Sequence, residues 1–315
     1  MTTTQASAPA KVILFGEHAV VYGRPAIAAP VSQVRATALV ADSAPTGVRL
    51  VAPDIGEAYW LADAGEEDPL AAAVRSVQEA AGRSRLPNLT ITVRSNIPVA
   101  SGLGSGAATA AALIRALALH LERPDLASNE SVSSLTYEVE TLHHGTPSGI
   151  DNTVVAYERP VYFIRRSPEN QIDTFRAGRP LRLLIADTGI RSSTRDVVSD
   201  VRRQWQAEPE RFEEIFTACG RIADAARRAI EAGDLERVGS LMQENQVWLR
   251  QMTVSSTELD RLAEAAGEAG ALGAKLSGAG RGGNIIALVT ESAEAAVRQA
   301  LSAAGALKIL ATTVR

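Results

Sequence analysis

Three short stretches of the chain combine glycine with serine or with charged residues in patterns that suit a chemical site. The first, "PVASGLGSGAA" at residues 98–108, follows an expected strand and precedes an alanine-rich segment expected to be helical. The first backbone N–H groups of a helix lack intrahelical acceptors and carry partial positive charge, so they favour a phosphate. Glycine permits the close backbone approach that such binding needs. A tight connection between a strand and a closely packed helix explains the same residues. This stretch alone therefore leaves two interpretations open, a phosphate site and a packing connection.

The other two stretches supply ionisable side chains. "KVILFGEHAVVYG" places Lys11 within an apolar strand and puts Glu17 and His18 in the loop that follows. In "EVETLHHGTPSGID", the candidate acid is Glu138 or Glu140, both on an expected helix, and Asp151 follows a Pro-Ser-Gly turn. A charge within a strand usually faces solvent, and an aspartate after a turn usually caps it. The functional alternative is a carboxylate on a loop at the mouth of a site, able to accept a proton or hold a cation.

Known glycine fingerprints fit this chain poorly. "GLGSGA" matches a loose G-x-G-x-x-A pattern, but a second helix follows where a dinucleotide-binding unit requires a strand. "GAGRGG", Gly278 to Gly283, matches G-x-G-x-x-G, but an expected strand follows it instead of a helix. The sequence contains no G-x-x-x-x-G-K-[ST]. The context therefore disfavours a dinucleotide site and excludes a Walker-type phosphate loop.

The composition is that of a globular protein, with 46% hydrophobic and 22% charged residues among 315. A net charge of −4 gives no reason to expect nucleic acid or a membrane surface as a partner. The N-terminus lacks the pattern of a secretory signal, and the single cysteine, Cys219, excludes an internal disulfide. We therefore expect a cytoplasmic protein. Only three basic residues are lysines, and two of them, Lys11 and Lys275, lie beside glycine-rich stretches. A lysine supplies a compact point charge, although chance alone could place them so.

Hydrophobic patterns predict an α+β chain with a domain boundary near residue 178. In the N-terminal domain, residues 1–178, we expect helices at 69–82, 107–121 and 129–143. We expect strands at 10–15, beginning at about 25, and at 33–42, 47–53, 57–63, 89–97 and 153–166 (a pair or one bent strand). In the C-terminal domain, residues 179–315, we expect helices over 193–271, broken near 208–209, 233 and 253–256, a helix at 292–305, and strands at 181–189, 273–278, 284–289 and 307–314. This second order is that of a ferredoxin-like α+β unit.

Taken together, these motifs resemble those of the GHMP kinases, and within that family those of the mevalonate kinases. The matching stretches are "APAKVILFGEHAVVYG", "PVASGLGSGAA", "HGTPSGIDN" and "KLSGAGRGGNIIAL", which extend from residue 8 into the C-terminal domain. The resemblance implies an N-terminal domain like domain 2 of ribosomal protein S5 and a ferredoxin-like C-terminal domain. It also implies transfer of the γ-phosphoryl group of ATP, with Mg²⁺, to the C5 hydroxyl of mevalonate in isoprenoid biosynthesis.

The resemblance assigns roles by position. Asp151 corresponds to the catalytic base and Lys11 to its charge partner, while Glu140 and Ser105 correspond to magnesium ligands. The implied mevalonate contacts are Glu17, His18, Asp151 and Thr194, with Arg191 and Arg195 as candidates for its carboxylate. The implied nucleotide contacts are Pro98, Ala100, Ser101, Gly102, Leu103, Gly104, Ser105, Gly106, Ala107, Gly278, Ala279 and Gly280.

The chain departs from the family pattern in three places. Gly106 stands where many relatives have a second serine, Arg281 replaces a glycine, and residues 157–163 replace a Gly-Gly turn. The first departure concerns the metal ligands, and the other two concern loop geometry. Other hypotheses are a kinase for phosphomevalonate or a sugar, a non-catalytic ligand sensor on the same fold, and a dinucleotide-dependent oxidoreductase. A homodimer is compatible with the sequence.

Overall fold

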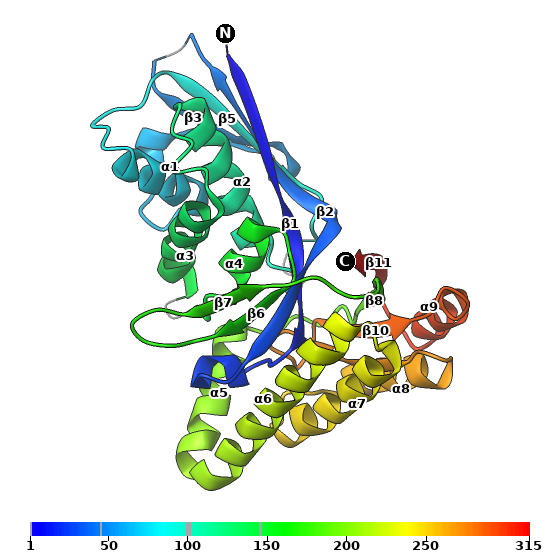
Figure 1. Ribbon diagram of the computed structural model, residues 1–315. Helices are drawn as coiled ribbons and strands as arrows, with labels where there is room; N and C mark the ends of the chain where they lie inside the picture. Colours follow the sequence, from blue (N-terminus) through cyan, green and yellow to red (C-terminus); the bar gives the residue numbers. More distant parts are fainter. Residues whose placement is uncertain (1, 45, 99–101, 145–146) are drawn as a thin grey trace. The chain divides into compact units, whose positions relative to one another are not determined.

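The computed structural model describes residues 2–44, 46–98, 102–144 and 147–315 (Figure 1). The chain divides into two compact units that interleave along the sequence. Unit 1 comprises Met1–Lys11, Ser32–Val99 and Gly104–Glu158, and unit 2 comprises Val12–Val31, Ala100–Leu103 and Arg159–Arg315.

The interleaving has a simple structural cause. Two long strands, β1 (Thr3–Phe15) and β2 (Ala26–Asp42), each contribute one segment to each unit. The last change of unit falls between Glu158 and Arg159, about twenty residues before the expected boundary. Consecutive domains at 1–178 and 179–315 therefore do not coincide with the compact units, and that division stays a prediction.

Unit 1 consists of a sheet and four helices. Its elements besides segments of β1 and β2 are β3 (Val48–Ala52), β4 (Glu57–Trp60), β5 (Leu89–Ser95), α1 (Pro69–Ala80), α2 (Ser105–His120), α3 (Asn129–His144), α4 (Ile150–Tyr157) and the 3₁₀ turns η2 (Pro53–Ile55) and η3 (Leu61–Asp63). The strand order is β4-β3-β5-β2, in which only β3 and β5 are parallel. Helix α2 packs against α1, α3, α4 and β5. This central position explains its composition.

The alanines of α2 are packing residues. Ten of its side chains are buried: Ala107, Ala108, Ala110, Ala111, Ala112, Leu113, Ile114, Ala116, Leu117 and Ala118. Small side chains let three neighbouring helices approach it closely, as interiors at close-packed density require. The packing interpretation of the alanine-rich segment is therefore confirmed, and it leaves the glycine loop before the helix to be explained separately.

Unit 2 contains a four-stranded antiparallel sheet with helices on it. Its elements are η1 (Ala19–Tyr22), β6 (Val161–Ile164), β7 (Gln171–Thr174), β8 (Leu181–Asp187), α5 (Thr194–Ala207), α6 (Pro209–Ala232), α7 (Leu235–Gln251), α8 (Thr257–Glu268), β9 (Gly273–Ser277), β10 (Asn284–Val289), α9 (Glu294–Ala303) and β11 (Lys308–Val314). The sheet order is β11-β8-β10-β9. Numbered along the chain, these strands lie in the order 4-1-3-2, with helices between the first two and between the last two, which confirms the predicted ferredoxin-like unit.

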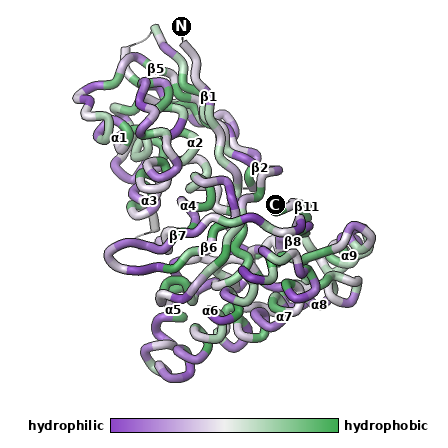
Figure 2. The backbone as a smooth tube through the Cα atoms, viewed as in Figure 1, coloured by the Kyte–Doolittle hydropathy of each residue, from purple (hydrophilic) through white to green (hydrophobic). Residues whose placement is uncertain are grey.

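Local signals placed the helix breaks in unit 2 correctly. Pro209 opens α6, and Gly233 ends it with φ 72, a left-handed conformation that suits glycine. Hydrophobic and hydrophilic residues alternate along α6 and α7 (Figure 2), and the apolar face of α6 buries Phe212, Phe216 and Cys219. These side chains belong to the core of unit 2, which also contains strands β8 and β10.

One predicted element is wrong. Residues 153–166, expected as strands, form helix α4 up to Tyr157 and only then strand β6. The β-branched run of Thr153, Val154 and Val155 favours a strand locally, but all three side chains are buried in a helix that packs on α2 and α3. Strand β7, four residues long, was not predicted. Among the described residues, no helix is long and apolar enough to cross a membrane.

Candidate active site

The glycine loop ends in unit 1 at the N-terminus of α2. Gly104, the N-cap, has φ 71 and no side chain of its own to cap the helix, and the first intrahelical bond runs from the Ala108 N–H to the Gly104 carbonyl. A Cβ on Gly104 would lie 2.8 Å from Cγ of Lys11, so only glycine fits. The first-turn N–H groups of α2 therefore point out of the helix without a side-chain cap from Gly104, as an anion site requires.

The residues of this loop differ in exposure. Gly102 and Gly106 are exposed, whereas Leu103 and Ala107 are buried and can offer a ligand only their backbone. Pro98 and Ser105 are half-buried. Ala100 and Ser101, which were also expected to bind nucleotide, lie outside the described residues. The structure thus supports a backbone site more than a side-chain site.

Lys11 and Asp151 form an ion pair beside this loop. The distance from Lys11 Nζ to Asp151 Oδ2 is 3.0 Å, and Lys11 is only 4% exposed. Lys11 is therefore not on a solvent-facing position of its strand. Asp151 was expected on a loop, but it is the second residue of α4, after Gly149 as N-cap. The Asp151 carboxylate therefore lies in the first turn of α4 and contacts the ammonium group of Lys11.

Glu140, on α3, is the second acidic residue of this cluster. It is 9% exposed, and burial together with the negative charge of Asp151 raises its pKa to about 8, while Lys11 opposes the rise. A Cβ on Gly106 would lie 3.8 Å from Glu140 Oε1, which puts this carboxylate against the first turn of α2. Lys11, Glu140, Asp151 and the N-terminus of α2 therefore form one site within unit 1.

Two residues missed in the sequence fix the position of Asp151. Asn152 donates from Nδ2 to the Ser133 carbonyl at 3.1 Å and to the Ser133 hydroxyl at 2.9 Å, which ties α4 to α3. Thr153 donates its hydroxyl to the Gly149 carbonyl at 2.7 Å. Both follow Asp151 directly in the chain, and that adjacency is the only sequence signal for them. They hold the start of α4 against the helix that carries Glu140.

The carboxylates of this cluster could hold a metal only together with a ligand. No group of three or more His, Cys, Asp or Glu side chains that could hold a metal occurs among the described residues. Magnesium, however, is usually bound by one or two carboxylates together with phosphate and water oxygens. A buried carboxylate whose pKa is raised, such as Glu140, gains most from a nearby cation. The residues present fit a magnesium ion that takes its remaining ligands from a nucleotide.

In unit 2, Glu17 is an internal residue. Its Oε1 accepts a hydrogen bond from Lys275 Nζ, and both side chains are fully buried. Burial lowers the pKa of Lys275, and the charge of Glu17 and the hydrogen bond to it oppose this effect. A direct contact between the Glu17 carboxylate and a substrate finds no support in this burial.

His18 is held in an unusual backbone conformation beside that pair. Its φ is 58, in the left-handed region that few residues other than glycine adopt. Its Nε2 donates to the Ala279 carbonyl at 2.8 Å, and burial, aided by the positive charge of Arg281, lowers its pKa. His18 is therefore a neutral imidazole at neutral pH, with Nε2 as the protonated nitrogen.

Strand β9 and its loop attach to the first motif at alternating positions. Lys275 pairs with Glu17, and Ala279 accepts from His18. Between them, the Ser277 hydroxyl donates to the Ile13 carbonyl at 2.8 Å and accepts from the Ile13 N–H at 3.2 Å. Lys275 and Ser277 lie on one face of β9 because alternate residues of a strand face the same side. That face and the loop after it therefore contact the first motif.

The third glycine motif is also anchored. The Ser192 hydroxyl donates to the Gly280 carbonyl at 2.6 Å, and a Cβ on Gly280 would lie 2.0 Å from the Val254 carbonyl oxygen. Gly278 is half-buried. Thr194 is the exposed first residue of α5, after the N-cap Ser193. The guanidinium of Arg191, considered for a substrate carboxylate, lies 3.7 Å from Asp187. Unit 2 thus brings the first and third motifs together.

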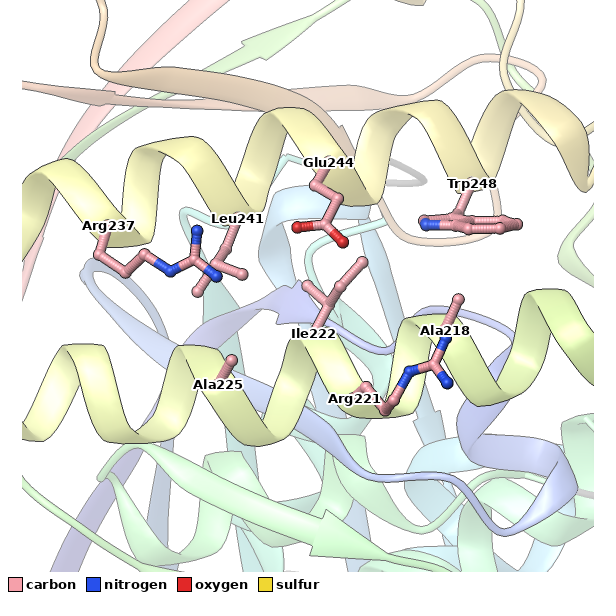
Figure 3. A pocket seen from close by; sticks show the side chains of 8 residues that line it. All are labelled: Ala218, Arg221, Ile222, Ala225, Arg237, Leu241, Glu244 and Trp248. Carbon is pink, nitrogen blue, oxygen red and sulfur yellow. The ribbon is translucent and has the colours of Figure 1, made fainter.

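A pocket of about 190 Å³ lies elsewhere in unit 2, between α6 and α7 (Figure 3). Its lining is Ala218, Arg221, Ile222, Ala225, Arg237, Leu241, Glu244 and Trp248. None of these residues belongs to a predicted site. The backbone and ion-pair geometry of the motifs, and not this hollow, therefore defines the candidate active site.

Comparison with known proteins agrees with the motifs. The family models of the GHMP kinases N terminal domain and the GHMP kinases C terminal match residues 69–159 and 226–307. A mevalonate kinase of Aeropyrum pernix is 40% identical, with 91% of this chain and 89% of that protein covered. The chain belongs to the GHMP kinase family. A mevalonate kinase of Thermococcus sibiricus is 36% identical, with 97% and 94% covered.

A solved structure supports the same family assignment. The crystal structure of L. major mevalonate kinase in complex with R-mevalonate has a TM-score of 0.84 and 32% identity, and it covers 100% of this chain and 96% of that one. The predicted GHMP kinase fold, with its mixed helices and strands, is therefore confirmed. Membership in this family makes the chain an ATP-dependent kinase, as the sequence predicts.

Proposed function

We propose that this GHMP kinase is a mevalonate kinase, which transfers the γ-phosphoryl group of ATP to the C5 hydroxyl of mevalonate. The relatives of that name support the substrate. The observation that carries the chemistry is the Lys11–Asp151 ion pair beside the N-terminus of α2. It combines a base with a backbone site for phosphate, which a pure ligand sensor would not need.

Asp151 is the proposed base. Its carboxylate accepts the proton of the C5 hydroxyl while the new bond from that oxygen to the γ-phosphorus forms. The bond between the γ-phosphorus and the bridging oxygen breaks, and ADP leaves with the electron pair. Phosphoryl transfer needs mainly positioning and charge stabilisation, so one oriented carboxylate suffices as the proton acceptor.

Lys11 has two proposed effects. At 3.0 Å from Asp151, its ammonium group fixes the orientation of the carboxylate. Its positive charge also stabilises negative charge that develops on the transferred group. The N–H groups of Ser105, Gly106 and Ala107 would hold phosphate oxygens at the first turn of α2. Pro98 and Gly102 to Gly104 complete the proposed loop.

Magnesium, when bound, would neutralise negative charge on the phosphates. We assign Glu140 and Ser105 to hold it, because Glu140 borders Gly106 at the first turn of α2 and Ser105 opens that turn. Glycine at 106 offers no hydroxyl. The metal would therefore depend on Glu140 and Ser105 more than in relatives that carry a second serine.

In unit 2 we assign His18 and Thr194 to mevalonate, and Gly278, Ala279 and Gly280 to the nucleotide. A neutral His18 can hydrogen-bond a substrate hydroxyl with its Nδ1 while Nε2 remains on the Ala279 carbonyl. Glu17, which precedes His18 in the chain, pairs with Lys275, and its contact with mevalonate stays a prediction. A cytoplasmic location and a homodimer stay predictions.

The test is a coupled assay of ADP release with ATP, Mg²⁺ and a panel of mevalonate, phosphomevalonate, galactose and homoserine. We expect turnover with mevalonate alone. The product should be identified as 5-phosphomevalonate by mass spectrometry, and Asp151→Ala serves as the blank. A chain that phosphorylates another member of the panel, or none, contradicts the proposed substrate.

A further inference from the structure

Arg281, the residue that replaces a glycine in the third motif, is turned toward α5. Its Nη2 forms an ion pair with Asp200 on α5. Its Nε donates to the Thr253 carbonyl at 3.1 Å, and Nη2 also reaches the Thr253 hydroxyl at 3.3 Å. The guanidinium is therefore engaged by two segments outside its own loop.

Asp200 is the centre of a closed network. Gln204 donates from Nε2 to Asp200 at 2.9 Å and to the Thr253 hydroxyl at 2.9 Å. Arg203 donates to the other Asp200 oxygen at 2.8 Å. The hydrogen bond from Arg281 is the main cause of the lowered pKa of Asp200, so the carboxylate is ionised at neutral pH. The side chains of Arg281, Asp200, Gln204 and Thr253, with the Thr253 carbonyl, thus connect the loop, α5 and the residues after α7.

The backbone at Arg281 is in a conformation that costs energy. Its φ is 53, in the left-handed region, which residues with a Cβ adopt only when their surroundings impose it. Its N–H donates to the Val254 carbonyl at 2.7 Å. A glycine would adopt this φ without cost, so the chain keeps arginine here against a backbone preference. The side-chain network is the compensation that the structure offers.

The loop is attached to the start of α5 on its other side. The Gly283 N–H donates to the Ile190 carbonyl at 2.9 Å, and Ser192 donates to the Gly280 carbonyl at 2.6 Å. Thr194 therefore lies between two attachments: the residues before α5 hold one side of the loop, and Asp200, further along α5, holds Arg281. Together they fix both the position and the direction of this helix.

We propose that Arg281 is a positioning residue that latches the third glycine motif to α5 and thereby sets Thr194 relative to Gly278 and Gly280. The inference rests on the proposed kinase function of these residues. The alternative is that Arg281 contacts nucleotide phosphate directly. The two differ in what Asp200 does: a latch needs Asp200 as much as Arg281, whereas a phosphate contact does not.

The experiment is a double-mutant cycle with Arg281→Met, Asp200→Leu and the double variant. Arg203→Met is the matched control, because Arg203 binds the same carboxylate from within α5 and connects no other element. We measure kcat and KM for ATP and for mevalonate. We expect each single variant to lose about tenfold in kcat/KM for ATP, the double variant to lose no more, and Arg203→Met to keep wild-type values within about twofold.

An opposite pattern overturns the latch. If Arg281→Met raises KM for ATP, Asp200→Leu does not, and the two effects add in the double variant, Arg281 contacts phosphate. An equal loss of kcat/KM in Arg203→Met would also overturn the latch, because Arg203 contacts Asp200 without reaching the glycine loop. A latch should also raise KM for mevalonate by the same factor in Arg281→Met and Asp200→Leu, because both variants release Thr194, and should leave it unchanged in Arg203→Met.

Hydrogen exchange separates this inference from the proposed function. Amides of residues 278–283 should exchange faster in Arg281→Met and Asp200→Leu than in Arg203→Met, whether or not the wild-type chain phosphorylates mevalonate. Faster exchange in an enzyme inactive on mevalonate supports the latch and contradicts the substrate. Unchanged exchange overturns the latch, and faster exchange with unaltered kcat and KM overturns its positioning role.

Discussion

The ammonium nitrogen of Lys11 lies 3.0 Å from the carboxylate of Asp151, and the stem of Lys11 fills the space where Gly104 has no side chain. One lysine thus touches both the proposed base and the N-cap of the phosphate-binding helix. The distance between the base and the helix N-terminus is therefore set by a single buried side chain.

Asp151→Ala should lower kcat by about 10³-fold, because the hydroxyl loses its proton acceptor. Nucleotide affinity should stay within about threefold, since backbone N–H groups of α2 make the proposed phosphate contacts. Lys11→Met should also lower kcat, and the Lys11→Met/Asp151→Ala double variant should be no slower than Asp151→Ala, because the two residues act as a unit. Steady-state kinetics and nucleotide titration measure both quantities. Near-normal turnover in Asp151→Ala would refute the assignment of the base.

Lys275→Met should lower the free energy of unfolding by about 3–5 kcal/mol, because it leaves the carboxylate of Glu17 buried without its cation. Both side chains are fully buried, so solvent does not compensate. The Glu17→Leu/Lys275→Met double variant removes both charges and should recover most of that loss. Chemical denaturation at neutral pH provides the values. A double variant as unstable as the sum of the two single variants would show that the pair does not act as a pair.

The sequence predicted what depends on neighbouring residues. Pro209 and Gly233 limit a helix by their own backbone preferences, so the breaks in unit 2 were placed correctly. The ferredoxin-like sheet was predicted from the order of strands and helices, which hydrophobic patterns along the chain indicate. The motif around Asp151 was recognised, but its helix was not, since Val154 and Val155 favour strands and only burial against α2 and α3 makes them helical.

Contacts between distant residues were beyond the sequence. Glu17 and Lys275 are 258 positions apart, and no spacing rule connects them. The family resemblance assigned Glu17 to the substrate; that assignment stays a prediction, and the structure pairs its carboxylate with Lys275. Arg281 was noticed as a departure from the family, but Asp200, its partner on α5, carries no motif. Such pairs become visible only when the fold brings the elements together.

Gly104→Ala tests the space at the N-cap of α2. The new Cβ would lie 2.8 Å from Lys11 Cγ, and φ 71 adds strain for any residue with a side chain. We expect a loss of about 1–3 kcal/mol in unfolding free energy and a fall in kcat, because Lys11 must move. Gly267→Ala, within α8 and with no atom within 4 Å of its Cβ, is the control and should be neutral or stabilising. Equal behaviour of the two variants would contradict the close contact.

The raised pKa of Glu140 should make the metal-free protein less stable as the pH rises. Its pKa is about 8 in the fold and 4.5 in its ordinary state, so between these values the folded protein holds a proton that the unfolded chain has released. The contribution is fully present below pH 4.5 and is lost as the pH rises toward 8, with a slope of up to about 1.4 kcal/mol per pH unit for one proton. Glu140→Gln removes this titration. Urea unfolding of both proteins from pH 5 to 8, in buffer with a chelator, measures the difference, and parallel pH profiles would show that Glu140 titrates normally.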